Sequence, residues 1–186
     1  LTWEIVNKMN LGVELGFLNG MIDLQLDYFD ERRKDIFMPR ESVPMTAGFM
    51  KQPWKNFGKV TNQGVEVSLN VNKQFGKDLF VSLMGTFTYA HNEITEKDEP
   101  SAVVGTNRAE TGHPVGQLTG YIAEGLFTED DFEDVSTGKL KEGIPTQSFV
   151  GKLRPGDIRY RDVNGDGKVD VFDKSPIGGT KDPEIV

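Results

Sequence analysis

Hydrophobic and polar residues alternate along four stretches in the first half of the chain. In the first stretch every second position is apolar, at Leu11, Val13, Leu15 and Phe17. The same spacing recurs over residues 22–28, 65–71 and 79–89. Because successive side chains of a β-strand point to opposite faces, this spacing predicts four strands, each with one apolar and one polar face.

Short turn sequences join these strands in pairs. Asn19-Gly20 separates the first two stretches, and this dipeptide favours a type I′ hairpin turn, which needs positive φ at both central positions. Gly76-Lys77-Asp78 separates the other two. The connection between the pairs, residues 38–57, contains three prolines and is expected to be an irregular loop at the opposite end of the strands. We therefore predict two antiparallel hairpins over residues 1–92.

Two kinds of protein fit this pattern. Runs of about ten alternating residues, tight turns at one end and longer connections at the other are typical of a transmembrane β-barrel. An interfacial girdle of aromatic residues would then come from Tyr28, Phe29, Phe75 and Tyr89. A soluble antiparallel sheet packed on another layer gives the same alternation. The periodicity leaves both alternatives open, although acids on the polar face disfavour the interior of a sandwich.

Composition excludes several other classes. No run of about 18 apolar residues is present, so no membrane-spanning helix is expected. The formal net charge of −8 argues against a nucleic-acid partner. The chain has no cysteine, and His91 and His113 stand in unrelated contexts, so we expect no thiolate site, zinc site or catalytic triad. The chain begins without an initiator Met and ends without a closing element, so we expect a piece of a longer protein.

The alternation disappears over residues 93–186, where Gly, Pro, Asp and Lys dominate. Such a long, largely irregular connection is unusual inside a compact soluble domain. It fits an external loop of a β-barrel. Residues 129–134 form an acidic run that we interpret as a solvated face.

Residues 162–173 match the twelve-residue calcium loop, with Gly167 at the position of the sharp turn. The predicted ligands, in loop order, are Asp162, Asn164, Asp166, Lys168 through its backbone carbonyl, Asp170 and Asp173. Asp is shorter than the usual Glu at the last position, which predicts weaker and structural Ca²⁺ binding. Prolines on both sides exclude flanking helices, so the loop is EF-hand-like without an EF-hand. The alternative is an acidic, glycine-rich turn without metal.

Five segments spread along the chain carry a resemblance to a known family. They are Leu1-Thr2-Trp3-Glu4, Asp27-Tyr28-Phe29, the run from Asn56 to Glu66, Gly112-His113-Pro114-Val115-Gly116-Gln117, and Pro155-Gly156-Asp157-Ile158 followed by Asp162-Val163-Asn164-Gly165-Asp166-Gly167. In this order they resemble the SusC/RagA family of TonB-dependent outer-membrane transporters. The fold class that follows is all-β: antiparallel hairpins from the C-terminal part of an outer-membrane β-barrel, with a long irregular external loop containing the calcium turn.

The resemblance also implies a function for the full-length protein. Such a transporter has an N-terminal plug, works with a SusD-type surface lipoprotein and with TonB, and imports oligosaccharides or peptides across the outer membrane. The chain carries neither the plug, nor the TonB-contacting segment, nor most of the strands. We therefore expect a non-enzymatic fragment in contact with outer-membrane lipid, with a glycan as the imported ligand and calcium stiffening its external loop.

A second hypothesis is a soluble, secreted calcium-binding β module that binds carbohydrate and packs its apolar strand faces together. Dependence on detergent would separate the two, because barrel strands in isolation expose apolar faces and open edges. A glycan hydrolase is a third class, which activity of the chain itself would have to support.

Overall fold

The computed structural model describes residues 1–186, except for the side chain of Met45. It divides into two compact units. The first, here called the sheet unit, comprises Leu1–Ser101, Glu110–Gly116 and Thr180–Val186. The second, the insert unit, comprises Ala102–Ala109 and Gln117–Gly179. Within the described residues, no helix has the length and apolar character needed to cross a membrane.

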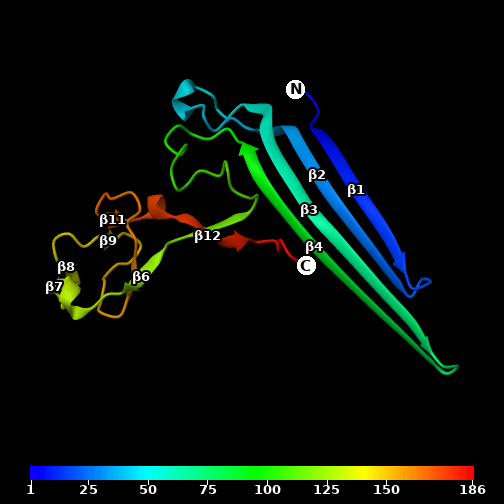
Figure 1. Cartoon of the computed structure of the whole chain (residues 1–186). Helices are drawn as coiled ribbons and strands as arrows, with labels where there is room; N and C mark the ends of the chain where they lie inside the picture. Colours follow the sequence, from blue (N-terminus) through cyan, green and yellow to red (C-terminus); the bar gives the residue numbers. More distant parts are fainter. The chain divides into compact units, whose positions relative to one another are not determined.

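The sheet unit is built on four long antiparallel strands that neighbour one another in chain order (Figure 1). Their lengths, 13 to 22 residues, exceed the usual 3–10 of globular proteins. The two predicted hairpins are confirmed. The strands are β1 (Ile5–Phe17), β2 (Ile22–Pro39), β3 (Trp54–Phe75) and β4 (Leu79–Glu96).

The register places the alternating apolar residues of all four strands on one face. Leu11 lies opposite Tyr28, which lies opposite Val65, and Val65 lies opposite Tyr89. The rows that follow toward the tight turns, such as Val13, Leu26, Val67 and Phe87, are apolar in the same way. Most side chains of this face are exposed, with Leu11 at 66% and Leu83 at 64%. The result is a continuous apolar face with no layer covering it.

The opposite face of the sheet is polar. It carries the carboxylates of Glu14, Asp23, Asp27 and Glu66. Phe29, predicted to join the aromatic girdle with Tyr28, is on this polar face, and that prediction is wrong for Phe29. Neighbouring residues of a strand point to opposite sides, so Tyr28 and Phe29 cannot share a face. The Phe29 ring lies against Gly64 on the adjacent strand.

The connections at the two ends of the sheet differ in length, as the sequence predicts. At one end Asn19 and Gly20 both have positive φ, and the Met21 N–H donates to the Leu18 carbonyl at 3.3 Å, as in a type I′ turn. Gly76, with φ of 65°, turns the second hairpin. At the other end β2 and β3 are joined by residues 40–53, which contain a short 3-10 helix (Met45–Ala47).

The outer edge of β4 is also paired. Thr88 and Val186 exchange backbone hydrogen bonds of 2.8 and 3.0 Å, and the Ala90 N–H donates to the Glu184 carbonyl at 2.9 Å. Tyr89 and Ile185 form an antiparallel bridge. Residues 184–186 therefore pair with the outer edge of β4, and residues 97–183 lie between these two paired segments.

The insert unit contains short two-stranded sheets around a small core. Phe127, Phe132 and Leu153 form this core and are nearly fully buried. Each strand has only two to six residues, which is too short to show an alternation pattern in the sequence, so the sequence does not predict these strands. They are β5 (Gln117–Gly120) with β12 (Ser175–Thr180), β6 (Ala123–Leu126) with β10 (Ile158–Tyr160), β7 (Phe132–Asp134) with β8 (Lys139–Leu140), and β9 (Thr146–Gln147) with β11 (Lys168–Val169). Glu129–Asp131 and Val171–Asp173 form 3-10 helices.

Candidate functional site

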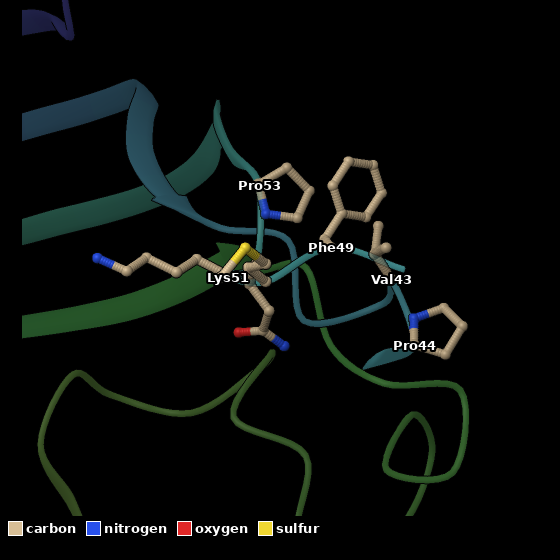
Figure 2. A pocket seen from close by; sticks show the side chains of 7 residues that line it. Val43, Pro44, Phe49, Lys51 and Pro53 are labelled. Atoms are coloured by element: carbon tan, nitrogen blue, oxygen red, sulfur yellow. The ribbon is translucent and has the colours of Figure 1, made fainter. Parts of the chain in front are cut away.

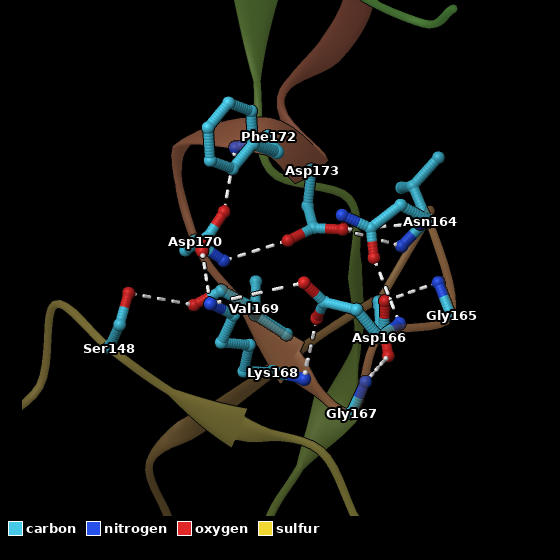
Figure 3. A network of polar contacts seen from close by, with 12 residues as sticks. Ser148, Asn164, Gly165, Asp166, Gly167, Lys168, Val169, Asp170, Phe172 and Asp173 are labelled. Carbon is cyan, nitrogen blue, oxygen red and sulfur yellow. Dashed lines mark hydrogen bonds and ion pairs between the residues drawn. The ribbon is translucent and has the colours of Figure 1, made fainter.

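The predicted calcium loop folds through hydrogen bonds from its own backbone (Figure 3). The Asp162 carboxylate accepts from the Gly165 N–H at 2.7 Å and the Gly167 N–H at 2.8 Å. Asn164 Oδ1 accepts from the Asp166 N–H at 2.9 Å. Asp166 Oδ1 accepts from the N–H of Lys168, two residues further along the chain, at 3.0 Å. These bonds wind residues 162–168 into a tight coil, in which positive φ at Gly165 and Gly167 is required.

Asp173 closes the loop from its other end. Its side chain is fully buried. Oδ1 accepts from the Val163 N–H at 2.8 Å, and Oδ2 accepts from the Asp170 N–H at 2.7 Å. One carboxylate thus joins the start of the loop to its end, while Val169, also fully buried, anchors the middle.

Neighbouring segments of the insert unit hold the loop in place. The Ser148 backbone N–H and hydroxyl both donate to the Val169 carbonyl, at 3.0 and 3.1 Å (Figure 3). The Asn107 amide donates to the Lys174 carbonyl at 2.7 Å. β9 and β11 pair in parallel beside these contacts. The loop is therefore part of the folded insert unit.

The oxygen donors fit a hard cation such as Ca²⁺ in kind, since they are carboxylates, an amide and backbone carbonyls. Within the described residues, no group of three or more acidic or histidine side chains is placed to hold a metal ion. Asp170 Oδ1 accepts from the Phe172 N–H at 2.8 Å, and the Lys168 ammonium lies 3.4 Å from Asp170 Oδ2. Calcium binding at Asp162, Asn164, Asp166, Lys168, Asp170 and Asp173 stays a prediction.

A buried clamp in the sheet unit was not predicted from the sequence. Asp98, only 6% exposed, accepts from Arg40 Nε at 2.9 Å, from the Ser42 N–H at 3.2 Å and from the Ser42 hydroxyl at 2.8 Å. Burial alone would raise the pKa of Asp98, but the hydrogen bonds from Arg40 and Ser42 outweigh it and hold this pKa below its ordinary value. The clamp fixes the β2–β3 connection to the segment that follows β4. Its members are too far apart in sequence to give a local signal.

The same connection carries a small open hollow (Figure 2). Lys51 is the one ionisable side chain lining the hollow. Its walls are mainly apolar, from Val43, Pro44, Phe49 and Pro53. Such a lining suits contact with an apolar group, and it brings no acid, base or nucleophile together.

The fold by itself defines a class of protein. Long antiparallel strands with one exposed apolar face, one polar face, tight turns at one end and long connections at the other are the features of a membrane β-barrel. The family model for the β-barrel of TonB dependent receptor-like proteins matches residues 1–176, and the chain belongs to this family. Proteins of this family are outer-membrane proteins.

Relatives agree with this assignment. The chain is 29% identical over 175 residues to the TonB-dependent receptor SusC of Bacteroides thetaiotaomicron, a match that covers 94% of the chain and 16% of SusC. It is 24% identical over 189 residues to the TonB-dependent receptor P3 of Formosa agariphila, covering 96% of the chain and 18% of that receptor. The predicted resemblance to the SusC/RagA family is confirmed. The chain spans less than a fifth of the length of these relatives.

A solved structure shares the fold. The structure of the RagAB peptide importer in the "closed-closed" state superposes with a TM-score of 0.65 at 22% sequence identity. The match covers 100% of the present chain and 19% of the importer chain. The all-β, hairpin-built architecture is thus that of a segment of a much longer barrel.

Proposed function

We propose that this chain is the part of a TonB-dependent outer-membrane transporter that supplies four adjacent barrel strands and one elaborated external connection. The observation that carries the proposal is the pair of contrasting faces of β1 to β4. The apolar side of the sheet contacts lipid, and the polar side with its carboxylates lines the water-filled interior. The tight turns then lie on the periplasmic side and the insert unit belongs to an external loop.

The apolar band has the height that a bilayer requires. In β3 it extends from Val65 to Phe75, and Lys73, next to the turn, is the one charged side chain of β3 within it. Ten residue steps correspond to about 33 Å along a strand, and a tilt of about 40° reduces this to about 25 Å, the height of the apolar band of outer-membrane barrels. Tyr28 and Tyr89 mark its external border, and Phe75 marks the border at the turns.

The full-length transporter imports oligosaccharides in this proposal, together with a SusD-type surface lipoprotein and with energy passed through TonB. The role of TonB is supported by the relatives, which are named TonB-dependent receptors, and the oligosaccharide is what the resemblance to the SusC/RagA family implies. The structural neighbour is a peptide importer, which makes a peptide the alternative cargo. In this proposal the insert unit, as an external connection, contacts the cargo or the lipoprotein. A calcium ion held at residues 162–173 would stabilise it.

A pair of substitutions on adjacent residues of β2 tests the proposal. Leu24 is on the apolar face near the middle of the band, and Gln25 is on the polar face next to the acidic residues. In the full-length transporter, Leu24→Arg should lower the yield of folded barrel in the outer membrane, because an Arg near the bilayer midplane costs about 2–4 kcal/mol. Gln25→Arg should leave assembly and ligand uptake close to those of the parent. Equal effects of the two variants would contradict the assignment of the faces.

A further inference from the structure

Three aromatic rings gather on the surface of the insert unit beside the predicted calcium loop. Tyr121 and Phe149 are stacked with centroids 4.6 Å apart, and Tyr160 lies 5.5 Å from the first ring and 5.8 Å from the second. Tyr121 follows β5, Phe149 follows β9 and Tyr160 ends β10. Three separate segments therefore converge on one aromatic cluster, here called the ring cluster.

The ring cluster differs from the apolar core of the same unit. Phe127 in the core is 2% exposed, whereas Phe149 is 46% exposed. An aromatic ring that serves only packing is expected to be buried, because burial of its apolar surface is what stabilises the fold. Phe149 leaves about half of its surface available for contact with another molecule.

Polar groups around the ring cluster have no partner in the protein. Neither phenol hydroxyl of Tyr121 and Tyr160 forms a hydrogen bond with any described residue. In the part of the chain that the structure describes, the one buried side-chain nitrogen or oxygen without a partner is Arg159 Nε, so both hydroxyls reach solvent. The Lys174 ammonium lies 5.6 Å from the centre of the Tyr121 ring and has no carboxylate within 4.0 Å among the described residues.

We propose that Tyr121, Phe149 and Tyr160, together with Lys174, form a stacking site for a pyranose ring of a saccharide. This inference rests on the proposed import of oligosaccharides and names the residues of the insert unit that would contact the cargo. A pyranose ring has a flat face of C–H groups and a rim of hydroxyls. The exposed face of Phe149 suits the first, and the two phenol hydroxyls suit the second. The Lys174 ammonium, over the Tyr121 ring, would contact a neighbouring residue of the saccharide.

A peptide fits this cluster less well. Extended peptides are held mainly by main-chain hydrogen bonds along a strand edge. The ring cluster offers side-chain rings, hydroxyls and a charge from turns and strand ends. The ammonium would also form an ion pair with an acidic saccharide, so neutral and acidic sugars share the stacking face and differ in their contact with Lys174.

The test is calorimetric titration of the chain in detergent micelles with calcium present. The probes are cellohexaose as a neutral saccharide, hexagalacturonate as an acidic one, and a hexapeptide of mixed sequence. Phe149→Ala should weaken binding of both saccharides about tenfold, as expected for loss of one aromatic contact. Lys174→Gln should weaken hexagalacturonate alone. Val135→Ala is the control, because Val135 is similarly exposed and lies outside both the ring cluster and the predicted calcium loop.

The proposal is overturned if the parent chain binds neither saccharide. It is also overturned if Phe149→Ala binds both as the parent does, or if Phe149→Ala weakens the peptide alone. Near-ultraviolet circular dichroism of each variant shows whether the insert unit is folded. None of these results depends on assembly in the membrane, so they separate failure of the ring cluster from failure of the proposed barrel function.

Discussion

The carboxylate of Asp98 joins two segments that lie 58 residues apart in sequence, through Arg40 and Ser42. Removing one partner of a buried pair leaves the other desolvated and uncompensated. Asp98→Asn keeps the size of the side chain and removes its charge. We expect it to release the Ser42 amide, which should exchange with deuterium about tenfold faster or more, as loss of at least 1.4 kcal/mol of local stability implies. Asp130→Asn, at an exposed acid, should leave the Ser42 amide protected.

The clamp also predicts a pH dependence. The pKa of Asp98 in the folded protein lies below its ordinary value of 3.8. The ionised carboxylate therefore contributes its full stabilisation above pH 3.8, and this stabilisation is lost as the pH falls through the lower pKa of the folded protein. Exchange of the Ser42 amide, corrected for the intrinsic rate at each pH, should therefore rise only in strongly acidic solution. A rise centred near neutral pH would show that another group controls the clamp.

At Gly64 the sheet has no room for a side chain. A Cβ added there would lie 2.1 Å from the Tyr89 carbonyl oxygen and 2.6 Å from the Phe29 ring. Gly64→Ala should destabilise the sheet unit by about 1–3 kcal/mol, as other overpacking substitutions do. At Gly85 on β4 a Cβ would meet no atom within 4 Å, so Gly85→Ala is the matched control. Urea unfolding in detergent, monitored by circular dichroism, measures the free energy of unfolding of both variants. Equal stability of Gly64→Ala and Gly85→Ala would disprove the close packing at Gly64.

Among the elements, the predicted calcium loop can be tested most directly by substitution of its ligand residues. Asp162→Ala with Asp166→Ala removes two predicted ligands and three hydrogen bonds of the coil. Calorimetry should show Ca²⁺ binding by the parent chain and none by this double variant. Substitution of Asp130 and Asp134, two acids outside the loop, serves as the control and should leave binding unchanged. Absence of binding by the parent would reduce residues 162–173 to an acidic turn.

The elements also show what the sequence could and could not predict. The two hairpins were predictable because long strands with one apolar face repeat the same two-residue period many times. β7 and β8, with three and two residues, repeat it too few times to be recognised. The loop spacing predicted Asp162, Asn164 and Asp166 as a group, and these do lie on one coil. The clamp at Asp98 and the ring cluster depend on contacts between distant segments, which no local pattern records.

For the whole molecule, the central claim is that the two faces of the four-stranded sheet meet different solvents. A membrane β-barrel needs lipid on its apolar face and water on its polar face. A soluble module needs a second layer over the apolar face. The exposed apolar side chains of the sheet unit agree with the first case, and family membership agrees with it independently.

The most direct test is a scan of β2 by single cysteines. The chain itself contains no cysteine, and any cysteine elsewhere in the full-length transporter would first be replaced. Each of residues 23–28 would be replaced in turn in the full-length transporter, labelled with a fluorophore, and reconstituted in vesicles whose lipid tails carry a quencher. Labels at Leu24, Leu26 and Tyr28 should be quenched, and labels at Asp23, Gln25 and Asp27 should not. Quenching without this two-residue alternation, or at the second set of positions, would contradict the account.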